Sequence, residues 1–411
     1  MQSSSKPSSC KEQKLDEGSF VAFDHAAAGH EGVRCDESGS LIAKPCTEKE
    51  ILFYESGANH PAFQRYMPTF FGSLAAGAPE EALDISTANA ETPLVLTSAE
   101  TAGEVSSLPL ELATNTDSIS ISRPAKKPEE PWVPSGGKKL DTGLSIVLEN
   151  ITDGFVRPNV LDVKLGARLW DDDAVPDKRA KLDKVARETT SGSLGFRIAG
   201  MKTWVGEGQD TKQLETDVDI SAQHLPSTSS EKVKLKSKII ESGGYRRFDK
   251  WYGRGFNEHN VQQGFETFLD SAKAGKIDRS AFVAARVAAE LRSIQSVIES
   301  EESRMYSASV LIVYEGDPAA FERALEVEKK EAAKPESLST RAAGHGGGEE
   351  DEGEDDEEEE EEEEDLPKVH DIRLIDFAHA SWTPGQGADE NLLKGLRNVL
   401  QIMEGLSKVS N

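Results

Sequence analysis

The sequence has 411 residues, of which 36% are hydrophobic, so it can bury a sizeable core but exceeds the usual length of one compact domain. Its formal net charge is −27, and residues 349–365 contribute −16 of this, which leaves −11 for the rest of the chain. This acidic surplus argues against nucleic acid as a direct partner, because binding the phosphate backbone needs a surplus of lysine and arginine on one surface.

Cysteine usage and hydropathy indicate the cellular compartment in which we expect the protein. The three cysteines, Cys10, Cys35 and Cys46, have no metal-site spacing and cannot make an even-numbered disulfide framework. This usage fits a reducing compartment. No apolar run reaches the roughly eighteen residues of a transmembrane helix, and the polar N-terminus lacks the apolar core of a signal peptide. We therefore expect a soluble intracellular protein without a transmembrane segment.

The first part of the chain predicts a small lobe of antiparallel strands. Residues 1–16 are polar and predicted to be disordered. Leu41–Lys44 is predicted to be a strand, Glu48–Tyr54 the start of a helix, and Tyr66–Phe71 another strand. From about residue 75 to residue 139 the composition shifts to Ser, Thr, Ala, Glu and Pro without periodicity, which predicts a disordered insertion.

Two apolar strands follow, and the second carries charges. Leu144–Glu149 predicts the first strand and Pro158–Gly166 the second. Alternation places Asp162 and Lys164 on the same face of the second strand. The two charges could neutralise each other structurally, but charges set in an apolar strand favour a functional role.

The rest of the chain predicts a larger lobe that ends in an amphipathic helix bearing Leu392 and Met403 at helical spacing. A low-complexity segment at about 334–367 contains the acidic run 349–365, which cannot build a core and is predicted to be disordered. The other predicted elements are helices at Val175–Arg187, Asn257–Phe268 and Arg279–Glu299, strands at Leu194–Trp204, Ser307–Glu315 and Ile372–Phe377, and a polar loop at Gly206–Ser230.

Three features together supply the parts that phosphoryl transfer needs. They are a lysine followed six residues later by a glutamate, an aspartate and lysine on one strand, and an aspartate that ends another strand: Lys44, Glu50, Asp162, Lys164 and Asp376. The reaction needs a lysine that reaches phosphates and a carboxylate that holds magnesium. Singly, the Lys44 and Glu50 side chains could form a surface pair and Asp376 could cap a turn. Their conjunction favours a kinase.

Three segments resemble the inositol polyphosphate kinase family, and in particular its fungal multikinases. Pro158–Gly166 resembles the family's Pro-x-x-x-Asp-x-Lys-x-Gly signature, and Thr190–Met201 is similar to the segment that follows it in the fungal multikinases. Ile375–His379 is similar to the family's magnesium-binding Ile-Asp-Phe segment. The order and separation of the segments agree, and the similarity reaches from about Gly39 to the C-terminal helix, apart from the insertions.

The resemblance implies a two-lobed α+β fold, distantly similar to that of protein kinases, with ATP bound between the lobes. Residues 17–149 would form the N-lobe and residues 150–411 the C-lobe, with an inositol-phosphate-binding helical segment at about 168–190. The implied activity is ATP- and magnesium-dependent phosphorylation of inositol trisphosphate and tetrakisphosphate toward the pentakisphosphate. Whether a lipid phosphoinositide is also accepted stays open.

The resemblance also implies which residues bind the nucleotide. Lys44 would approach the phosphates, with Glu50 as its partner, and the backbone of Glu149 and Ile151 would face the adenine at the hinge. Asp376 would coordinate magnesium.

Catalysis and substrate binding are implied for a second set of residues. Lys164 would contact the transferring phosphoryl group or the substrate, and Asp162 the nucleotide or the reacting assembly, with the division of work between them left open. Each lysine of the predicted helix could instead belong to a solvated face, but as a set they favour phosphate capture. The predicted substrate-binding residues are Lys164, Arg168, Lys178, Lys181, Lys184, Lys250, Arg254 and His379.

Other kinds of protein fit less well. A protein kinase would need a Gly-x-Gly-x-x-Gly loop and a His-Arg-Asp motif, and a P-loop enzyme would need Gly-x-x-x-x-Gly-Lys-Ser/Thr; the sequence has none of these. The main alternative is a nuclear interaction protein whose acidic run 349–365 binds basic partners, such as transcription factors or histones, with kinase activity secondary. Family relatives imply residence in the nucleus and the cytoplasm.

Overall fold

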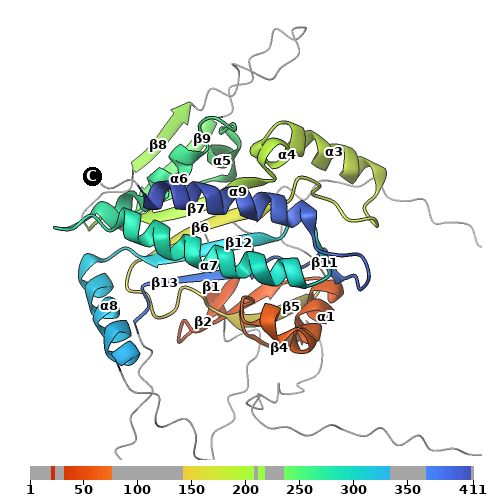
Figure 1. The fold of residues 1–411 in the computed structure, drawn as a ribbon, viewed down its shortest axis with the longest axis horizontal. Coiled ribbons are helices and arrows are strands. Elements are labelled where there is room, and N and C mark those ends of the chain that lie inside the picture. The colour runs from red at the N-terminus through yellow and green to blue at the C-terminus, as the bar shows by residue number, and fades with distance from the viewer. Residues whose placement is uncertain are drawn as a thin grey trace, which may run out of the picture.

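The computed structural model describes residues 20–23, 32–75, 142–207, 212–217, 236–333 and 367–408, which form two lobes (Figure 1). The predictions for residues 1–16, for nearly all of 75–139 and for the acidic run 349–365 lie outside these residues. No helix within the described ranges is long and apolar enough to cross a membrane.

The small lobe is an antiparallel five-stranded sheet in the order β1-β2-β3-β5-β4. Helix α1 (Glu48–Ser56) follows β3, and the hydroxyl of its N-cap Thr47 accepts a hydrogen bond from the Glu50 backbone N–H over 3.3 Å. A 3-10 turn, η2 (Gly57–Asn59), and helix α2 (Pro61–Gln64) follow. The strands are β1 (Phe20–Ala22), β2 (Arg34–Asp36), β3 (Leu41–Pro45), β4 (Phe70–Ala75) and β5 (Leu144–Glu149).

The large lobe is built on an antiparallel seven-stranded sheet in the order β13-β12-β6-β7-β10-β9-β8. Its strands are β6 (Pro158–Leu165), β7 (Phe196–Trp204), β8 (Lys212–Asp217), β9 (Lys236–Ser242), β10 (Tyr245–Phe248), β12 (Ser309–Glu315) and β13 (His370–Ile375), while β11 (Ser303–Met305) and β14 (Ala380–Trp382) pair with each other. Its helices are α3 (Pro176–Arg187), α4 (Thr190–Leu194), α5 (Lys250–Arg254), α6 (Gln262–Leu269), η4 (Asp270–Lys273), α7 (Ser280–Ser300), α8 (Pro318–Ala333) and α9 (Glu390–Ser407).

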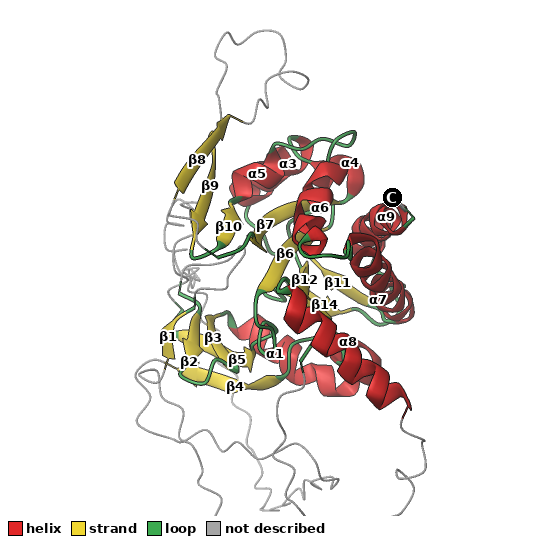
Figure 2. Ribbon diagram, turned by 90° about the vertical axis from the view of Figure 1, so that its left-hand side faces the viewer, coloured by secondary structure: helices red, strands yellow, loops and turns green. Residues whose placement is uncertain are grey.

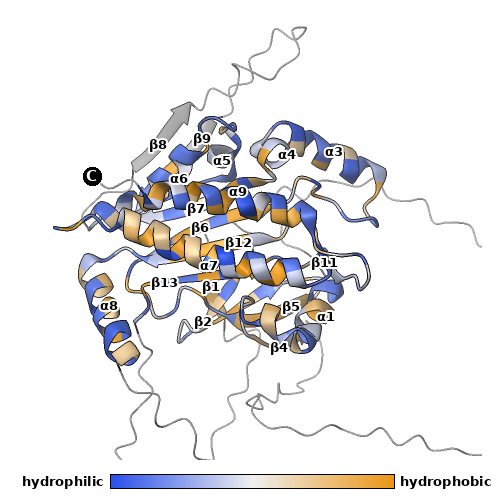
Figure 3. Cartoon of the chain, in the orientation of Figure 1, coloured by the Kyte–Doolittle hydropathy of each residue, from blue (hydrophilic) through white to orange (hydrophobic). Residues whose placement is uncertain are grey.

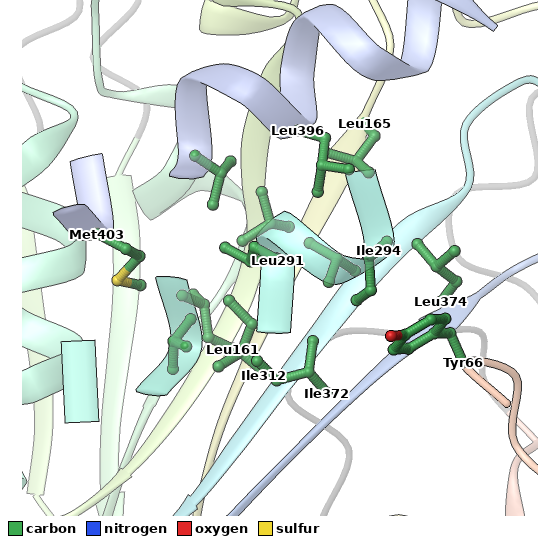
Figure 4. Close-up of a cluster of buried hydrophobic side chains, with 14 of the residues drawn as sticks. Tyr66, Leu161, Leu165, Leu291, Ile294, Ile312, Ile372, Leu374, Leu396 and Met403 are labelled. Carbon is green, nitrogen blue, oxygen red and sulfur yellow. The ribbon is translucent and has the colours of Figure 1, made fainter. Parts of the chain in front are cut away.

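One face of the large sheet is covered by helices. Figure 2 shows α6, α7 and α9 on the same side of the strands, and Figure 3 shows polar and apolar residues alternating along α7 and α9. Leu161 and Leu165 of β6 point into this layer, where they meet Leu291 of α7 and Leu396 of α9 (Figure 4). All four side chains are completely buried. Burial of these apolar side chains fixes which face of β6 is inside.

The opposite face of β6 is turned toward the small lobe. Because side chains alternate along a strand, burying Leu161 and Leu165 forces Asp162 and Lys164 onto this open face, as the sequence predicted. The alternation that builds the core therefore also presents the two charges to the space between the lobes.

The predicted strand Tyr66–Phe71 is wrong over its first four residues. The backbone N–H groups of Tyr66 and Met67 bond back to the carbonyls of Phe63 and Gln64, so these residues complete a turn after α2, and β4 begins only at Phe70. Both side chains are buried. A short apolar run at the end of a helix has the same pattern as a buried strand, which explains the error.

The predicted polar loop Gly206–Ser230 is wrong in part, because residues 212–217 form the edge strand β8, paired with β9. A short strand of mainly polar residues lacks the hydrophobic alternation by which strands are recognised. The helix predicted from Asn257 begins at Gln262. The prediction contained no strand at β1, β2, β9, β10, β11 or β14 and no helix at α2, α4, α5 or α8.

Candidate active site

Two lysines from different lobes meet on one carboxylate. The Nζ atom of Lys44, on β3, lies 2.7 Å from Oδ1 of Asp376, and the Nζ atom of Lys164, on β6, lies 3.1 Å from Oδ2. Asp376 directly follows β13, which is two strands away from β6 in the large sheet. The Lys164 ammonium and the Asp376 carboxylate, both singled out from the sequence, therefore meet where the two lobes face each other.

Lys44 is held between two carboxylates. Its Nζ atom lies 2.8 Å from Oε1 of Glu50, whose side chain is 2% exposed. Burial alone would lower the pKa of the Lys44 ammonium, but the charges of Asp376 and Glu50 outweigh it and hold the pKa well above its ordinary value. The pair is therefore not the ordinary surface ion pair that the sequence left open.

The residues that hold Lys164 have unusual backbone conformations. Among the described residues, the non-glycine positions with positive φ are Ser307, at 60°, and Asp376, at 70°. The Lys164 ammonium donates a hydrogen bond of 3.0 Å to the Ser307 carbonyl, and the Ser307 hydroxyl donates one of 2.9 Å to the Leu169 carbonyl. A non-glycine residue in this region costs on the order of 1 kcal/mol or more, and such strain concentrates at functional sites.

Asp162 is a buried carboxyl with an unused acceptor. Its side chain is 4% exposed, and Oδ1 has no hydrogen-bond donor in the described part of the chain. Burial raises the pKa of this carboxyl, the charge of Lys164 opposes that shift, and the charge of Asp376 adds to it. A buried acceptor without a donor is costly unless a ligand supplies one. The position therefore suits a ligand hydroxyl.

The donor set around Asp376 fits a metal that arrives with a nucleotide. No group of three or more His, Cys, Asp or Glu residues in the described ranges could hold a metal ion by itself. Magnesium is commonly bound by one or two carboxylates together with substrate phosphates and water. A single carboxylate flanked by the ammonium groups of two lysines fits that requirement.

The segment from Glu149 to Ile151 connects the lobes, and its backbone groups lie next to apolar side chains. The Glu149 carboxylate accepts hydrogen bonds from the backbone N–H and the hydroxyl of Thr69, so the side chain is engaged within the small lobe. Ile151 is buried in an apolar cluster bordered by Leu311 and Ile375. A hollow of about 400 Å³ opens beside this connection. Backbone groups next to apolar side chains suit a flat heterocycle such as adenine.

The first turn of α3 reaches the segment after β13. The Nζ atom of Lys178 lies 3.3 Å from Nε2 of His379, and Nδ1 of His379 lies 2.7 Å from the Asp171 carboxylate. Burial and the charge of Lys178 lower the pKa of His379, and Asp171 opposes them. These influences favour the neutral imidazole, which lies between a cation and an anion.

The other predicted cations near α3 differ from Lys178 in their surroundings. Lys181 is exposed. The side chain of Lys184 is 67% exposed and faces solvent, with its Nζ atom 3.8 Å from Oε1 of Glu188. The guanidinium of Arg168 stacks 4.0 Å from the ring centroid of Trp170 and borders an open hollow of about 650 Å³ between α1 and β14. Lys178 contacts the cleft through His379.

Helix α5 carries the remaining predicted cations. The charged groups of Lys250 and Arg254 lie 5.6 Å and 4.8 Å from the ring centroid of Trp251. The helix presses onto β7, where a Cβ atom added at Gly253 would fall 1.9 Å from the Ile198 carbonyl oxygen. Only glycine permits this approach, which brings Arg254 to the edge of the open sheet face.

The sequence analysis missed two basic residues of β7. In the strand register Arg197 lies opposite Lys164, and Lys202 lies opposite Val160, so both project onto the open face. Lys202 is 1% exposed, and its Nζ atom lies 4.1 Å from the ring centroid of Tyr245. For Arg197 the signal was its place between two large apolar residues at the start of β7, within a segment that already carried the resemblance.

Known proteins with similar sequences agree with this arrangement. Residues 145–404 match the sequence model of the family described as inositol polyphosphate kinase. The inositol polyphosphate multikinase of Saccharomyces cerevisiae is 29% identical over 397 residues, which cover 93% of this chain and 97% of that protein. The inositol polyphosphate multikinase of Schizosaccharomyces pombe is 32% identical over 182 residues, which cover 44% of this chain and 51% of that protein.

A solved structure shares the fold. The crystal structure of the inositol phosphate multikinase Ipk2 from Saccharomyces cerevisiae, in complex with ADP and Mn²⁺, superposes with a TM-score of 0.51 at 24% identity. The match covers 89% of this chain and 99% of that chain. The predicted two-lobed α+β fold is thereby confirmed.

Proposed function

Because the chain belongs to the inositol polyphosphate kinase family, we propose that it is an ATP-dependent inositol polyphosphate multikinase. It phosphorylates inositol trisphosphate and tetrakisphosphate toward the pentakisphosphate, with Mg²⁺ accompanying the nucleotide. The observation that carries the proposal is the meeting of the Lys44 and Lys164 ammonium groups on the Asp376 carboxylate between the lobes. The similarity to the yeast multikinase along nearly its whole length supports the substrate class.

The chemistry needs fixed positive charge at the transferring group. A ring hydroxyl oxygen bonds to the γ-phosphorus of ATP while the bond from that phosphorus to the ADP oxygen breaks. Negative charge spreads over the γ-oxygens and the leaving oxygen, so cations held there in advance lower the barrier. Two such cations are present. The Lys44 ammonium is held by an ion pair with Glu50, and the Lys164 ammonium by a hydrogen bond to the Ser307 carbonyl.

Asp376 would hold the divalent ion, which when bound neutralises phosphate charge. In the structure, each Asp376 oxygen lies within hydrogen-bond distance of a lysine ammonium. Nucleotide phosphates offer those same ammonium groups new acceptors and leave the carboxylate to the ion. Lys44 and Lys164 would then hold the phosphates, and Asp376 would hold the ion.

Asp162 has two candidate roles, and kinetics can separate them. Its unused Oδ1 atom can accept a hydrogen bond from a hydroxyl of the nucleotide or from the reacting hydroxyl of the inositol ring. In the first case Asp162→Asn raises the KM for ATP. In the second it lowers kcat and leaves that KM unchanged.

Product analysis tests the proposed function. Incubation with inositol 1,4,5-trisphosphate, ATP and Mg²⁺, followed by chromatography, should give tetrakisphosphate and then pentakisphosphate, and Lys164→Ala should give neither. A single phosphorylated position would restrict the enzyme to one transfer, and an unphosphorylated substrate would contradict kinase function. A parallel assay with a phosphoinositide in vesicles determines whether lipid is accepted.

We also propose that the acidic run 349–365 binds basic proteins. Sixteen carboxylates in 17 residues offer a complementary charge to basic proteins, as an addition to catalysis. Residence in the nucleus and the cytoplasm is proposed with it. Deleting residues 349–365 should leave product formation unchanged and remove retention of the protein on immobilised histones at low salt. Loss of activity in the deletion would instead connect the run to catalysis.

A further inference from the structure

We propose that the guanidinium groups of Arg197 and Arg254 jointly bind a phosphate that the inositol ring already carries, and so determine how strongly phosphorylated a substrate must be. The inference rests on the proposed function and deepens it. It assigns to this pair the recognition of a phosphate that is not transferred, apart from the lysines at the reacting group.

Arg197 is fixed on the open face of the large sheet. It lies directly opposite Lys164 in the pairing of β6 with β7, and neighbouring strands are about 4.8 Å apart. Its Nη1 atom donates a hydrogen bond of 2.9 Å to the hydroxyl of Ser191, which is completely buried in α4. An arginine carries five N–H donors, and no other acceptor for them lies in the described part of the chain. One edge of the guanidinium is thus anchored and the other donors stay available.

Arg254 is brought to the same place by the packing of α5. Gly253 touches the backbone of Ile198, the residue after Arg197, so α5 lies directly on this part of β7. The Arg254 guanidinium lies over the indole of Trp251, 4.8 Å from the ring centroid, which limits its freedom. The two guanidinium groups therefore come from elements whose separation is fixed by backbone contact.

The charge of Arg254 acts on Arg197, and neither guanidinium has an ion-pair partner in the described ranges. Burial lowers the pKa of Arg197 to about 10, and the charge of Arg254 contributes to the shift, while Asp162 opposes it. Burial likewise lowers the pKa of Arg254, and Glu188 opposes that shift. Two like charges withdrawn from water repel each other until an anion lies between them. A phosphate group supplies two negative charges and acceptors that match the planar fork of arginine.

The position of the pair suits a phosphate on the ring that reacts. Lys164 contacts the carboxylate next to which transfer occurs, and Arg197 is one strand away on the same face. A ring whose hydroxyl points toward Lys164 can therefore extend a phosphate on another carbon toward Arg197 and Arg254. A ring without that phosphate would leave both guanidinium groups unpaired, which disfavours its binding.

The competing explanation is that Arg197 merely anchors α4 through Ser191. Four variants separate the two explanations. Arg197→Gln removes the charge, Arg197→Lys keeps the charge but loses the fork, and Ser191→Ala removes the anchor but keeps the guanidinium. Arg292→Gln changes an exposed arginine of α7, paired with Glu404, and serves as the matched control.

Steady-state kinetics and calorimetric binding of inositol 1,4,5-trisphosphate provide the test. Arg197→Gln should raise the KM and the dissociation constant for inositol trisphosphate roughly 10- to 100-fold, with the KM for ATP unchanged, because a charge-assisted hydrogen-bond pair is lost. Arg197→Lys should show an intermediate effect, Ser191→Ala a rise of at most about threefold, and Arg292→Gln none. Combining Arg197→Gln with Arg254→Gln should cost less than the sum of the single changes, since both contact one phosphate.

Two results would overturn the inference. One is an Arg197→Gln variant with the same inositol trisphosphate affinity as the wild type, and the other is an equal loss of affinity in Ser191→Ala, which would make Arg197 a structural anchor. Failure of the proposed function looks different, because the wild-type protein would then transfer no phosphate to any inositol phosphate. The calorimetric comparison of the variants would still report on the arginine pair.

Discussion

The lobe junction and the open face of the large sheet are the two ends of the cleft. They differ in whether their positive charges are balanced by carboxylates. At the junction of the lobes, Lys44 and Lys164 both contact the Asp376 carboxylate, so cations and anions balance. On the open sheet face, Arg197 and Arg254 lie near each other with no ion-pair partner in the described residues. The first arrangement is complete without a ligand, whereas the second is completed by an anion.

The difference follows from what each end has to bind. A nucleotide brings both negative phosphates and a divalent cation, so the site must supply cations and a carboxylate together. An inositol polyphosphate brings negative charge only, so its site needs cations alone and gains from an unbalanced positive field that attracts a polyanion. The net acidity of the whole chain conceals this local surplus.

Replacing the Asp376 carboxylate, which both lysines contact, should nearly abolish phosphoryl transfer at the lobe junction. Asp376→Asn should lower kcat roughly a thousandfold or more, because charge stabilisation by a bound metal ion contributes several kcal/mol to the transition state. Asparagine tolerates the positive φ of 70° at this position, so the backbone should keep its conformation. Rapid-quench measurement of transfer, with Asp270→Asn as an exposed control, provides the test. Retained turnover would mean that the metal is held elsewhere.

Folding of the Asp376→Asn variant should be affected far less than its activity. Lys44 keeps its 2.8 Å contact with Glu50, and Lys164 keeps its 3.0 Å bond to the Ser307 carbonyl. We expect the free energy of unfolding to fall by no more than about 1–3 kcal/mol, the cost of one charged hydrogen-bond partner. Circular-dichroism melts of the same protein preparation measure this, and a collapsed structure would show that Asp376 serves mainly as the link between the lobes.

Asp162 lies between the lobe junction and the arginine pair on the open sheet face. Its replacement tests whether the carboxyl is kept for stability or for function. Because burial raises the pKa of its carboxyl, the folded state binds this proton more tightly than the unfolded state does. Stability from this group is present at pH values below the unfolded pKa of about 4 and is lost as the pH rises through the folded value. Asp162→Asn should therefore melt at a higher temperature than the wild type at pH 7, by a few degrees or so, and the difference should vanish near pH 3.

The same Asp162→Asn variant should lose activity, since it removes the acceptor at Oδ1. A gain in stability with a loss of kcat or ATP affinity identifies a residue kept for function. If the variant instead melts at a lower temperature at pH 7, Asp162 acts chiefly as the counter-charge of Lys164 and Arg197.

The lobe junction could be predicted from sequence because its residues lie in short local patterns. Asp162 and Lys164 are two positions apart in an apolar strand, and Asp376 ends another. Arg197 could not be found this way, since its meaning comes from register with a strand more than thirty residues earlier and from the bulge between Asp162 and Val163. Residue spacing shows which side chains share a face of one element, but not which faces meet.

The α3 lysines show the same limit. Lys178 and Lys184 both belong to the predicted substrate-binding set, but Lys178 reaches His379 while Lys184 lies on the solvent side next to Glu188. Six residues along an α-helix correspond to about 240° of further rotation beyond a full turn, which turns the second side chain away from the first. The tertiary position of α3 decides which lysine faces the cleft.

Lys178→Ala should weaken the substrate end only modestly. We expect the KM for inositol trisphosphate to rise roughly three- to tenfold and the KM for ATP to stay the same, because one partly solvated cation is lost from a group of several. Lys184→Ala, the matched change on the exposed side, should have a smaller effect on the same constant. Equal effects of the two changes would mean that both lysines act only through the long-range field.

The smallest expected effect is a shift in the titration of His379. Burial and the Lys178 charge lower its pKa while Asp171 opposes them, so the imidazole binds a proton less readily in the folded state than in the unfolded state. The stability that depends on this group is full above the unfolded pKa of about 6.5 and declines as the pH falls through it. Lys178→Ala should therefore raise the pKa of His379, and Asp171→Asn should lower it further. Imidazole proton resonances followed by NMR between pH 4 and 8 measure both shifts.

Inositol trisphosphate should move the His379 titration in the same direction as Lys178→Ala. A polyanion bound beside Lys178 screens its charge and favours the imidazolium form, so the pKa of His379 should rise when substrate is added. Inorganic sulfate at the same ionic strength controls for general screening. A pKa that responds to Lys178→Ala but not to substrate would place the inositol phosphate away from α3, and the positive field of the substrate end would then come from β7 and α5 alone.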